Sequence, residues 1–446
     1  MQSWKNILRW LLPAVTLPVY YWLAYQTDRT EFGTLLLAWS MVFLLFIYFY
    51  QQKEIYGEKL LFASGILFRL VFLFSLPALS NDFFRFVWDG RLIINGLNPF
   101  LHLPRDIINQ PVGILIDPGW ELFEGMGHLQ PENYSCYPAF NQFLFGLASL
   151  IFPHSIIGNV VMLRLIIVLF DVATFFFIKK ILTRLGMNKR LAFLYFLNPL
   201  TIIELTGNLH FEGVMIFFLA ASLYCLIKTR YTLSALLLAF SVSVKLIPLI
   251  FLPLFFRKLG WKKSVIYYLT VFIVTGLLFL PFIDQGLISN IFSSLDLYFR
   301  SFEFNASIYY IVREIGYAVK GWNIIATAGP AMAVLVFLSV VSLAIFRKNE
   351  NNKALITSML FAVAIYYFLS TTVMPWYVLT LLFLSVFTPY RFVLLWSFTL
   401  ILSYKTYSNP VWQENLWLNI IEYVPVYLLM FWELYTRRTK TEMAPG

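Results

Sequence analysis

Apolar runs of about twenty residues recur along the whole chain, and they restrict its fold more than any other feature. Each run is long enough to cross the hydrocarbon core of a bilayer as a helix, which satisfies its own backbone hydrogen bonds there. The composition agrees, because 60% of the 446 residues are hydrophobic and only 13% are charged. We therefore predict an all-α polytopic membrane protein with one integral membrane domain over residues 1–446 and no separate soluble domain.

The Lys and Arg residues lie in short loops between the apolar runs, and their positions predict the orientation of the chain. Short loops rich in positive charge remain on the cytoplasmic side of a membrane. Lys5 and Arg9 therefore place the N-terminus inside, and Arg437 and Arg438 place the C-terminus inside. We expect a multi-pass protein of the inner (plasma) membrane with both termini cytoplasmic. The net charge of +10 is explained by these loops, so no nucleic-acid partner is predicted.

A polar block follows the third apolar run and begins with SNDFFRFVWDGRLIINGLNPF at residues 80–100. The apolar segment 138–152 resembles a further span, but a crossing there would carry the five positive charges of 179–190 to the outer side. We instead predict that 138–152 is an amphipathic helix lying in the outer interface. The first outer loop then extends from 80 to 154.

The stretch between the basic loops at 228–230 and 257–263 is long enough for one ordinary span, although both loops should lie inside. Two loops on the same side require two crossings between them, which two short helices that meet near Lys245 would provide. Pro248 and Pro253 fit such a broken geometry, which puts Lys245 at an outer turn. With the later apolar runs, the chain should contain about fourteen spans.

This topology gathers the unusual polar residues at the outer face, where ionisable groups at membrane depth indicate function. If 81–95 is helical, Asp82, Arg85 and Asp89 share one face. A carboxylate such as Asp82 at the boundary between water and membrane is a candidate general base. The site candidates are Asp82, Asp89, Arg91, Asn98, Tyr137, Glu204, His210, Glu212, Lys245, Arg300, Trp376 and Tyr377.

Each candidate also has a purely structural interpretation. Asp82 is a favourable residue at a helix N-terminus, and Asp89 in Trp-Asp-Gly is suited to bonding loop backbone. Trp376 and Tyr377 are typical of an interfacial aromatic belt. Ionisable residues within apolar runs are interpreted as contacts that hold the bundle together, namely Arg69, Arg164, Asp171, Lys405 and Glu422.

Six short motifs are spread from about residue 80 to residue 380. They are D-F-F-R-F-V-W-D-G-R-x4-G-x-N-P-F from Asp82, Y-P-A-x-N-Q-x-x-F from Tyr137, R-x6-D from Arg164, N-P-L-x-I-x-E-x-x-G-N-x-H-x-E from Asn198, S-V-K-L-I-P-L-I-x-L-P from Ser243 and P-W-Y-V-L from Pro375. In this order they resemble the GT-C superfamily of polytopic glycosyltransferases that use polyprenyl-phosphate sugars, most closely its bacterial mannosyltransferase-like branch. The chain differs from these relatives at Ala139, where a second proline is common, and at Glu212, where an aspartate is common.

The resemblance implies a GT-C type bundle with a large first outer loop that carries interfacial helices. It also implies that an aspartate of this loop, here Asp82, deprotonates an acceptor hydroxyl, which displaces polyprenyl phosphate from the anomeric carbon with inversion. The implied donor is a polyprenyl-phosphate hexose that lies in the membrane lipid. In this branch the hexose is mannose. The acceptor would be a glycolipid or another glycan.

The implied mechanism assigns roles to the other candidates. Charge on the departing phosphate requires cations, with Lys245 as the first choice, Arg91 as the second and Arg300 as a further candidate. Trp376 and Tyr377 would border the groove for the prenyl chain. Sugar or acceptor hydroxyls would contact Asp89, Asn98, Tyr137, Glu204, His210 and Glu212. No metal site is predicted, although Glu204, His210 and Glu212 offer an alternative as ligands of a divalent cation.

Three other classes of membrane protein remain as alternatives. A lipid-linked sugar transporter or flippase would hold its polar residues near the midplane, often within repeats. A lipid-linked glycan polymerase or ligase would share the outer face and the lipid phosphate, and a structural protein would not need so many carboxylates. The polar set at one face and the long outer loop favour an interfacial enzyme. A soluble nucleotide-sugar donor is disfavoured, because the sequence has no Gly-rich strand–turn–helix phosphate site.

Overall fold

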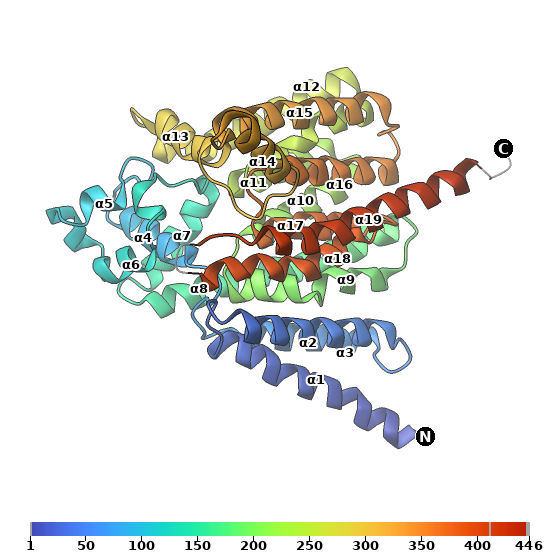
Figure 1. Ribbon diagram of the computed structural model, residues 1–446. Coiled ribbons are helices and arrows are strands. Elements are labelled where there is room, and N and C mark those ends of the chain that lie inside the picture. The colour runs from blue at the N-terminus through green and yellow to red at the C-terminus, as the bar shows by residue number, and fades with distance from the viewer. Residues whose placement is uncertain (1, 410–411, 443–446) are drawn as a thin grey trace.

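The computed structural model describes residues 2–409 and 412–442, and it consists of helices and the loops between them. Over these residues the β-type pairing is limited to one parallel bridge between Phe304 and Thr372. The helices lie side by side as an elongated bundle (Figure 1). The prediction of an all-α protein is therefore confirmed.

Helices that run along the bundle form its body, and a large apolar core lies between them. They are α1 (Gln2–Tyr25), α2 (Phe32–Gln51), α3 (Glu58–Val71), α8 (Ile156–Arg184), α10 (Glu212–Ile227), α11 (Tyr231–Val244), α12 (Leu252–Phe279), α15 (Ile325–Phe346), α16 (Asn352–Leu369), α17 (Val378–Ser385), α18 (Phe392–Thr399) and α19 (Leu416–Glu442).

The predicted outer loop forms a group of short helices at one end of the bundle, on the left in Figure 1. They are α4 (Asp82–Ile94), α5 (Pro104–Ile107), η1 (Pro111–Leu115), α6 (Gly119–Gly125), η2 (Gln130–Glu132) and α7 (Ala139–Ile151). The remaining short elements are η3 (Lys189–Ala192), α9 (Phe193–Phe196), η4 (Thr201–Gly207), η5 (Ile247–Phe251), η6 (Leu280–Phe282), α13 (Leu287–Arg300), α14 (Ile308–Lys320), η7 (Pro375–Tyr377) and η8 (Leu400–Ser408).

Several bundle helices are long and apolar enough to cross a membrane. Within the described residues these are α2, α8, the stretch Ile247–Phe282, α15 and α16, with a sixth if η4 and α10, bent by 115°, form one span. These helices support the prediction of a membrane protein. The count of about fourteen spans stays a prediction, because many of the bundle's helices are short or broken.

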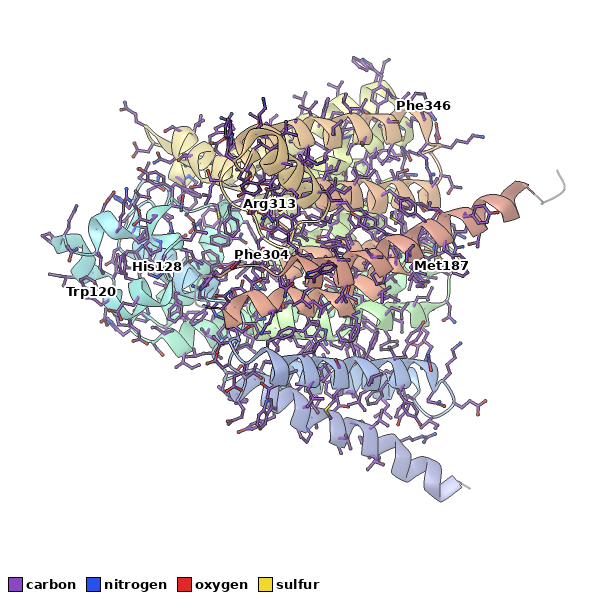
Figure 2. All side chains as sticks on the ribbon, viewed as in Figure 1. Trp120, His128, Met187, Phe304, Arg313 and Phe346 are labelled. Atoms are coloured by element: carbon purple, nitrogen blue, oxygen red, sulfur yellow. The ribbon has the colours of Figure 1, made fainter. Side chains whose placement is uncertain are left out.

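The two ends of the bundle separate the loops that the charge pattern assigns to opposite sides. Trp120 and His128, from the outer loop, lie at one end in Figure 2, whereas Met187 and Phe346 lie at the other. The first turns of α1 and the last turns of α19 lie at the same end as Met187 and Phe346 (Figure 1). Both described ends of the chain therefore lie opposite the outer loop, whereas the side of the membrane that they face stays a prediction.

Hydrogen bonds between distant loops support the same arrangement at the end rich in positive charge. Lys179 Nζ donates to Glu58 Oε2 at 2.6 Å, which links α8 to the first residue of α3. Lys258 Nζ donates to Asn352 Oδ1 at 2.6 Å, which links the stretch after η5 to the start of α16. The basic loops therefore contact one another, as loops on one side of a membrane should.

The break near Lys245 is present as predicted. α11 ends at Val244, Lys245 has an extended backbone (φ −156°, ψ 139°), and η5 begins at Ile247. A second break follows at Gly260, whose φ of +71° is left-handed and interrupts α12. Gly260 tolerates this conformation because glycine has no Cβ. Two short helices therefore meet at Lys245, and a longer one follows.

The interfacial helix predicted over 138–152 corresponds to α7, which packs along α4. Gly90 makes this packing possible, because a Cβ atom there would lie 2.5 Å from the Phe145 carbonyl oxygen and would also contact Ser149 Oγ. The glycine of Trp-Asp-Gly is thus explained by the close approach of two helices. α4 itself agrees with the helix expected over 81–95.

Candidate active site

Asp82 occupies the first turn of α4, at the junction between the outer helices and the bundle. Its carboxylate is half-buried and accepts a hydrogen bond of 2.8 Å from Gln130 Nε2. The Tyr137 side chain also hydrogen-bonds to it. The preceding residue, Asn81, donates to the Met126 carbonyl at 2.8 Å and so fixes the start of the helix. Asp82 is therefore held in place and still partly open.

Opposing effects act on the pKa of Asp82. Burial raises it above its ordinary value, and the negative charge of Glu212 acts in the same direction. The charges of His210 and Lys245 and the hydrogen bond from Tyr137 lower it, but the net pKa remains raised. A carboxylate whose pKa is shifted towards neutrality is a better general base at physiological pH. Tyr137 is thus bonded to Asp82, and the charges of His210, Lys245 and Glu212 are near enough to act on its pKa.

Lys245 reaches this cluster from the break between α11 and η5. Its ammonium forms an ion pair with Glu212 Oε1 and lies 4.0 Å from the centroid of the Tyr377 ring. The Lys245 side chain is 30% exposed, whereas that of Glu212 is 5% exposed. A buried carboxylate and an aromatic face thus hold a cation that remains accessible, which suits it to an incoming anion.

His210 and Trp376 form a stacked pair beside this cation. Their ring centroids are 3.6 Å apart and their planes differ by 19°. His210 Nε2 lies 3.3 Å from Glu204 Oε2, and the Tyr404 hydroxyl donates to Glu204 Oε1 at 2.6 Å. Because Glu204 is fully buried, it acts on the site through His210.

Arg164 holds the segments that carry Asp82 and His210 together. It is fully buried, and its guanidinium donates to the carbonyls of Ser75 at 2.7 Å and of Thr206 at 2.7 Å. Ser75 lies before α4, and Thr206 lies at the end of η4, a π-helix that precedes the sharp turn to α10. The turn around His210 is therefore fixed relative to the start of α4.

Asp89 lies two turns along α4 from Asp82 and is bonded by side chains of the outer loop and of α4 and α7. It is fully buried, and Arg85 Nε lies 2.7 Å from its Oδ1. Ser135 Oγ donates to Oδ2 at 2.5 Å, and Gln142 Nε2 donates to Oδ2 at 3.1 Å. Because protein groups occupy both oxygens, Asp89 belongs to the scaffold in our interpretation, and the predicted sugar contact is not adopted.

Three further site candidates are also not brought to the cluster. Arg91 is 1% exposed and donates to the Phe152 carbonyl at 2.7 Å. Asn98 Nδ2 donates to the Phe282 carbonyl at 2.8 Å. Arg300 forms an ion pair with an aspartate one turn earlier on the exposed α13. Arg91 and Arg300 are therefore engaged elsewhere and do not join Lys245 at the cluster. Asn98 holds a loop in place.

Two residues at the site are not predicted by the sequence. Gln130 lies in the polar loop and has no distinctive sequence pattern, although it binds Asp82. Tyr404, on η8, supports Glu204 from 200 positions away. The polar stretch Ser403–Ser408, which follows an apolar run, is the sequence signal for Tyr404.

The alternative of a divalent cation at Glu204, His210 and Glu212 does not fit the geometry. Across residues 2–409 and 412–442, no group of three or more His, Cys, Asp and Glu side chains gathers as metal ligands. Glu204 is engaged by Tyr404, and Glu212 is engaged by Lys245. No step of the reaction is therefore assigned to a metal at these residues.

Comparison with known proteins identifies the family. Residues 7–259 match the family model described as "Alpha-(1->6)-mannopyranosyltransferase, N-terminal domain", a range that includes Asp82, His210 and Lys245. "Alpha-(1->6)-mannopyranosyltransferase A" of Corynebacterium glutamicum is 22% identical over 351 residues, which cover 71% of this chain and 69% of that protein. Both findings agree with the resemblance to GT-C mannosyltransferases, and the chain therefore belongs to the alpha-(1->6)-mannopyranosyltransferase family.

Proposed function

We propose that the protein transfers a mannosyl residue from a polyprenyl-phosphate donor to a hydroxyl of a glycan or glycolipid acceptor, forming an α-(1→6) bond. The observation that carries this proposal is an accessible ammonium, that of Lys245, whose charge acts on the pKa of the half-buried Asp82. A base and a cation within one site are what a displacement of phosphate by a hydroxyl requires. The family relationship supports mannose as the transferred sugar and the α-(1→6) linkage.

The reaction begins at the carboxylate of Asp82, which accepts the proton of the acceptor hydroxyl. The acceptor oxygen then forms a bond to the anomeric carbon of mannose on the face opposite the phosphate. The bond between that carbon and the phosphate oxygen breaks, and its electron pair remains on the phosphate. The configuration at the anomeric carbon is therefore inverted, and the proton on Asp82 is later released to water.

Lys245 stabilises the phosphate as it leaves, because its ammonium is the accessible cation of the cluster. In the structure this ammonium pairs with Glu212, and a phosphate competes for the same charge when the donor binds. Tyr377, whose ring lies against Lys245, borders the first units of the prenyl chain. The leaving group is already a stable phosphate, so a strong general acid is not required.

His210 and Tyr137 contact the mannosyl hydroxyls in this proposal. The stacked Trp376 fixes the plane of the His210 ring, and Glu204 Oε2 lies 3.3 Å from its Nε2. Tyr137 orders the Asp82 carboxylate by hydrogen bonding. The site is thus organised before the donor binds, which lowers the cost of orienting the reactants.

The proposed function is tested with purified protein and three donors: polyprenyl-phosphate mannose, polyprenyl-phosphate glucose and GDP-mannose. A manno-oligosaccharide serves as acceptor, and release of polyprenyl phosphate is measured together with the linkage of the product. We expect an α-(1→6)-mannosyl product from the lipid mannose donor alone. Transfer from GDP-mannose would overturn the proposal of a lipid donor. Movement of the lipid across vesicle membranes without formation of product would identify a flippase.

The proposal also places residues 1–446 in one integral domain of the plasma membrane, with both termini in the cytoplasm. The active site would then face outward. Cysteines introduced over 100–130 should react with an impermeant reagent added outside intact cells, whereas cysteines over 181–188 should react only after lysis. The reverse pattern would place the site on the cytoplasmic side.

A further inference from the structure

A buried ion pair on α4 has no part in the reaction as proposed so far. Arg85 Nε donates to Asp89 Oδ1 at 2.7 Å, and the two side chains are 3% and 0% exposed. Arg85 follows Asp82 by one turn of helix, and Asp89 follows Arg85 by another. The ion pair and the candidate base therefore share one face of α4.

The part of the outer loop just before α7 is fastened to this face by the ion pair. Arg85 Nη1 donates to the carbonyl oxygens of Gln130 and Asn133, each at 2.9 Å. Ser135 Oγ donates to Asp89 Oδ2 at 2.5 Å. Both members of the pair thus hold the loop, and they hold it at three nearby residues.

Tyr137 is fixed to the same pair through Gln142 of α7. Gln142 Nε2 donates to Asp89 Oδ2 at 3.1 Å and to the Tyr137 carbonyl oxygen at 3.2 Å. The Tyr137 ring packs edge-on against Phe86, the neighbour of Arg85 on α4, with the ring centroids 4.9 Å apart. The backbone and the ring of Tyr137 are therefore both placed relative to α4.

Gln130 and Tyr137 both hydrogen-bond to the side chain of Asp82. Gln130 Nε2 donates to Asp82 Oδ1 at 2.8 Å, and the Tyr137 side chain supplies a second hydrogen bond. The guanidinium of Arg85 is itself paired with Asp89. Arg85 is thus connected to the candidate base through the loop that it holds, rather than by a bond of its own.

We propose that Arg85 is a positioning residue of the reaction, which holds Gln130 and Tyr137 against Asp82 and so orients the carboxylate for the acceptor hydroxyl. This inference rests on the proposed function. A general base must lie within hydrogen-bond reach of the proton that it accepts. A displacement of about 1 Å at a reacting group can lower a rate about 10²-fold. The planar fork of Arg85 bonds Asp89 and the loop at once, which a lysine cannot do.

The hydrogen bonds that Arg85 holds also affect the protonation of Asp82. Donors to a carboxylate stabilise its ionised form, so loss of the bonds from Gln130 and Tyr137 should raise the pKa of Asp82. The acidic limb of the pH–rate profile should then move to higher pH. A change at Arg85 leaves in place the other titratable side chains that interact electrostatically with Asp82, namely His210, Glu212, Lys245, Tyr377 and Tyr407.

The inference is tested with Arg85→Lys, which keeps a positive charge beside Asp89 but loses the fork. We expect kcat for transfer from polyprenyl-phosphate mannose to fall about 10–100-fold, with little change in the donor KM. The acidic limb should move to higher pH by less than about one unit. Arg91→Lys is the matched control, because Arg91 is also buried on α4 and donates to the loop carbonyls of Asp117 and Phe152. This control should lower the melting temperature without moving the limb.

Two further variants separate positioning from a general loss of stability. Gln130→Leu removes one bond to Asp82 and leaves the ion pair intact, so Arg85→Lys should lower kcat less in this background than in the wild type. Gln142→Met cuts the link from Asp89 to Tyr137 and should move the limb in the same direction as Arg85→Lys. Fully additive effects of Arg85→Lys and Gln130→Leu overturn the inference. So does a limb that stays in place in Arg85→Lys, or in Gln142→Met if Arg85→Lys does not fold.

An infrared titration of the purified protein reads the pKa of Asp82 without catalysis. The carboxylic acid band that is lost in Asp82→Asn reports this group, and its midpoint should be higher in Arg85→Lys than in wild type. If that shift occurs but the protein transfers no mannose from the lipid donor, the proposed function fails and the positioning of Asp82 by Arg85 stands. If transfer proceeds and the midpoint is the same in both proteins, the positioning fails and the proposed function stands.

Discussion

Asp82 and Asp89 lie seven residues apart on α4, and their surroundings differ. Asp89 is fully buried and bonded by Arg85, Ser135 and Gln142. Asp82 is half-buried, with hydrogen bonds from Gln130 and Tyr137 and more distant charges around it. A buried carboxylate whose oxygens are fully hydrogen-bonded stabilises the fold. A partly exposed carboxylate that can accept further hydrogen bonds is available for chemistry.

The largest effect on activity is expected from a substitution at Asp82. Asp82→Asn should lower kcat about 10²–10⁴-fold, because the amide cannot accept the acceptor's proton. The melting temperature should change little, since the shape of the side chain is kept. Initial rates of mannosyl transfer and thermal unfolding in detergent measure the two effects. Turnover at the wild-type rate would remove Asp82 from the role of base.

At Asp89 we expect the opposite pattern. Asp89→Ala should cost about 3–5 kcal/mol of folding stability, because it leaves the buried Arg85 without its partner. Asp89→Asn is the control and should cost less, since it keeps hydrogen-bonding groups at this position. Thermal unfolding of the purified variants measures the loss. A stable Asp89→Ala protein with reduced kcat would reverse our assignment of the two aspartates.

Lys245 tests the part of the proposal that concerns the leaving phosphate. Lys245→Ala should lower kcat/KM for the donor about 10²–10³-fold, because it removes a charge that stabilises the departing phosphate. Lys245→Arg should retain much of the activity. Steady-state kinetics with varied polyprenyl-phosphate mannose provide the measurement. If donor kinetics were the same in Lys245→Ala as in wild type, another group would bind the phosphate.

Gly90 tests the scaffold side of α4 without changing any charge. Gly90→Ala should destabilise the protein by about 1–3 kcal/mol, because the added methyl group meets the Phe145 carbonyl of α7. The pH profile of activity should be unaffected. Thermal unfolding and a pH–rate curve distinguish these outcomes. A stability equal to that of wild type would show that α4 and α7 separate easily.

The smallest effect concerns the acidic limb of the pH–rate profile. kcat/KM should rise with pH through the raised pKa of Asp82, because only the ionised carboxylate accepts a proton. Glu212→Gln removes a negative charge that raises this pKa, so the limb should move to lower pH by less than about one unit. An unmoved limb, or one shifted to higher pH, would place the titrating group elsewhere.

Features that depend on local sequence and charge were predictable. The apolar runs predicted the helices, the basic loops predicted which ends of the bundle lie together, and the same charges predicted α7 and the break at Lys245. Lipid imposes these features on short stretches of chain, so neighbouring residues suffice to find them.

Features that depend on distant partners were not predictable. The sequence does not distinguish Asp89 from Asp82, because the hydrogen bonds from Ser135 and Gln142 to Asp89 appear only in the structure. Tyr404 meets Glu204 across 200 positions of sequence. The number of spans also remained open, because a π-helix such as η4 bends the chain sharply without an obvious signal.

The clamp formed by Arg164 restricts how the site opens. By joining the segment before α4 to the end of η4, it makes Asp82 and His210 parts of one rigid body. In our proposal, release of product would therefore begin elsewhere, and we expect the extended backbone at Lys245, between two short helices, to act as the hinge. Opening there would withdraw the ammonium from the phosphate that we propose it binds, while Asp82 and His210 keep their positions for the next turnover.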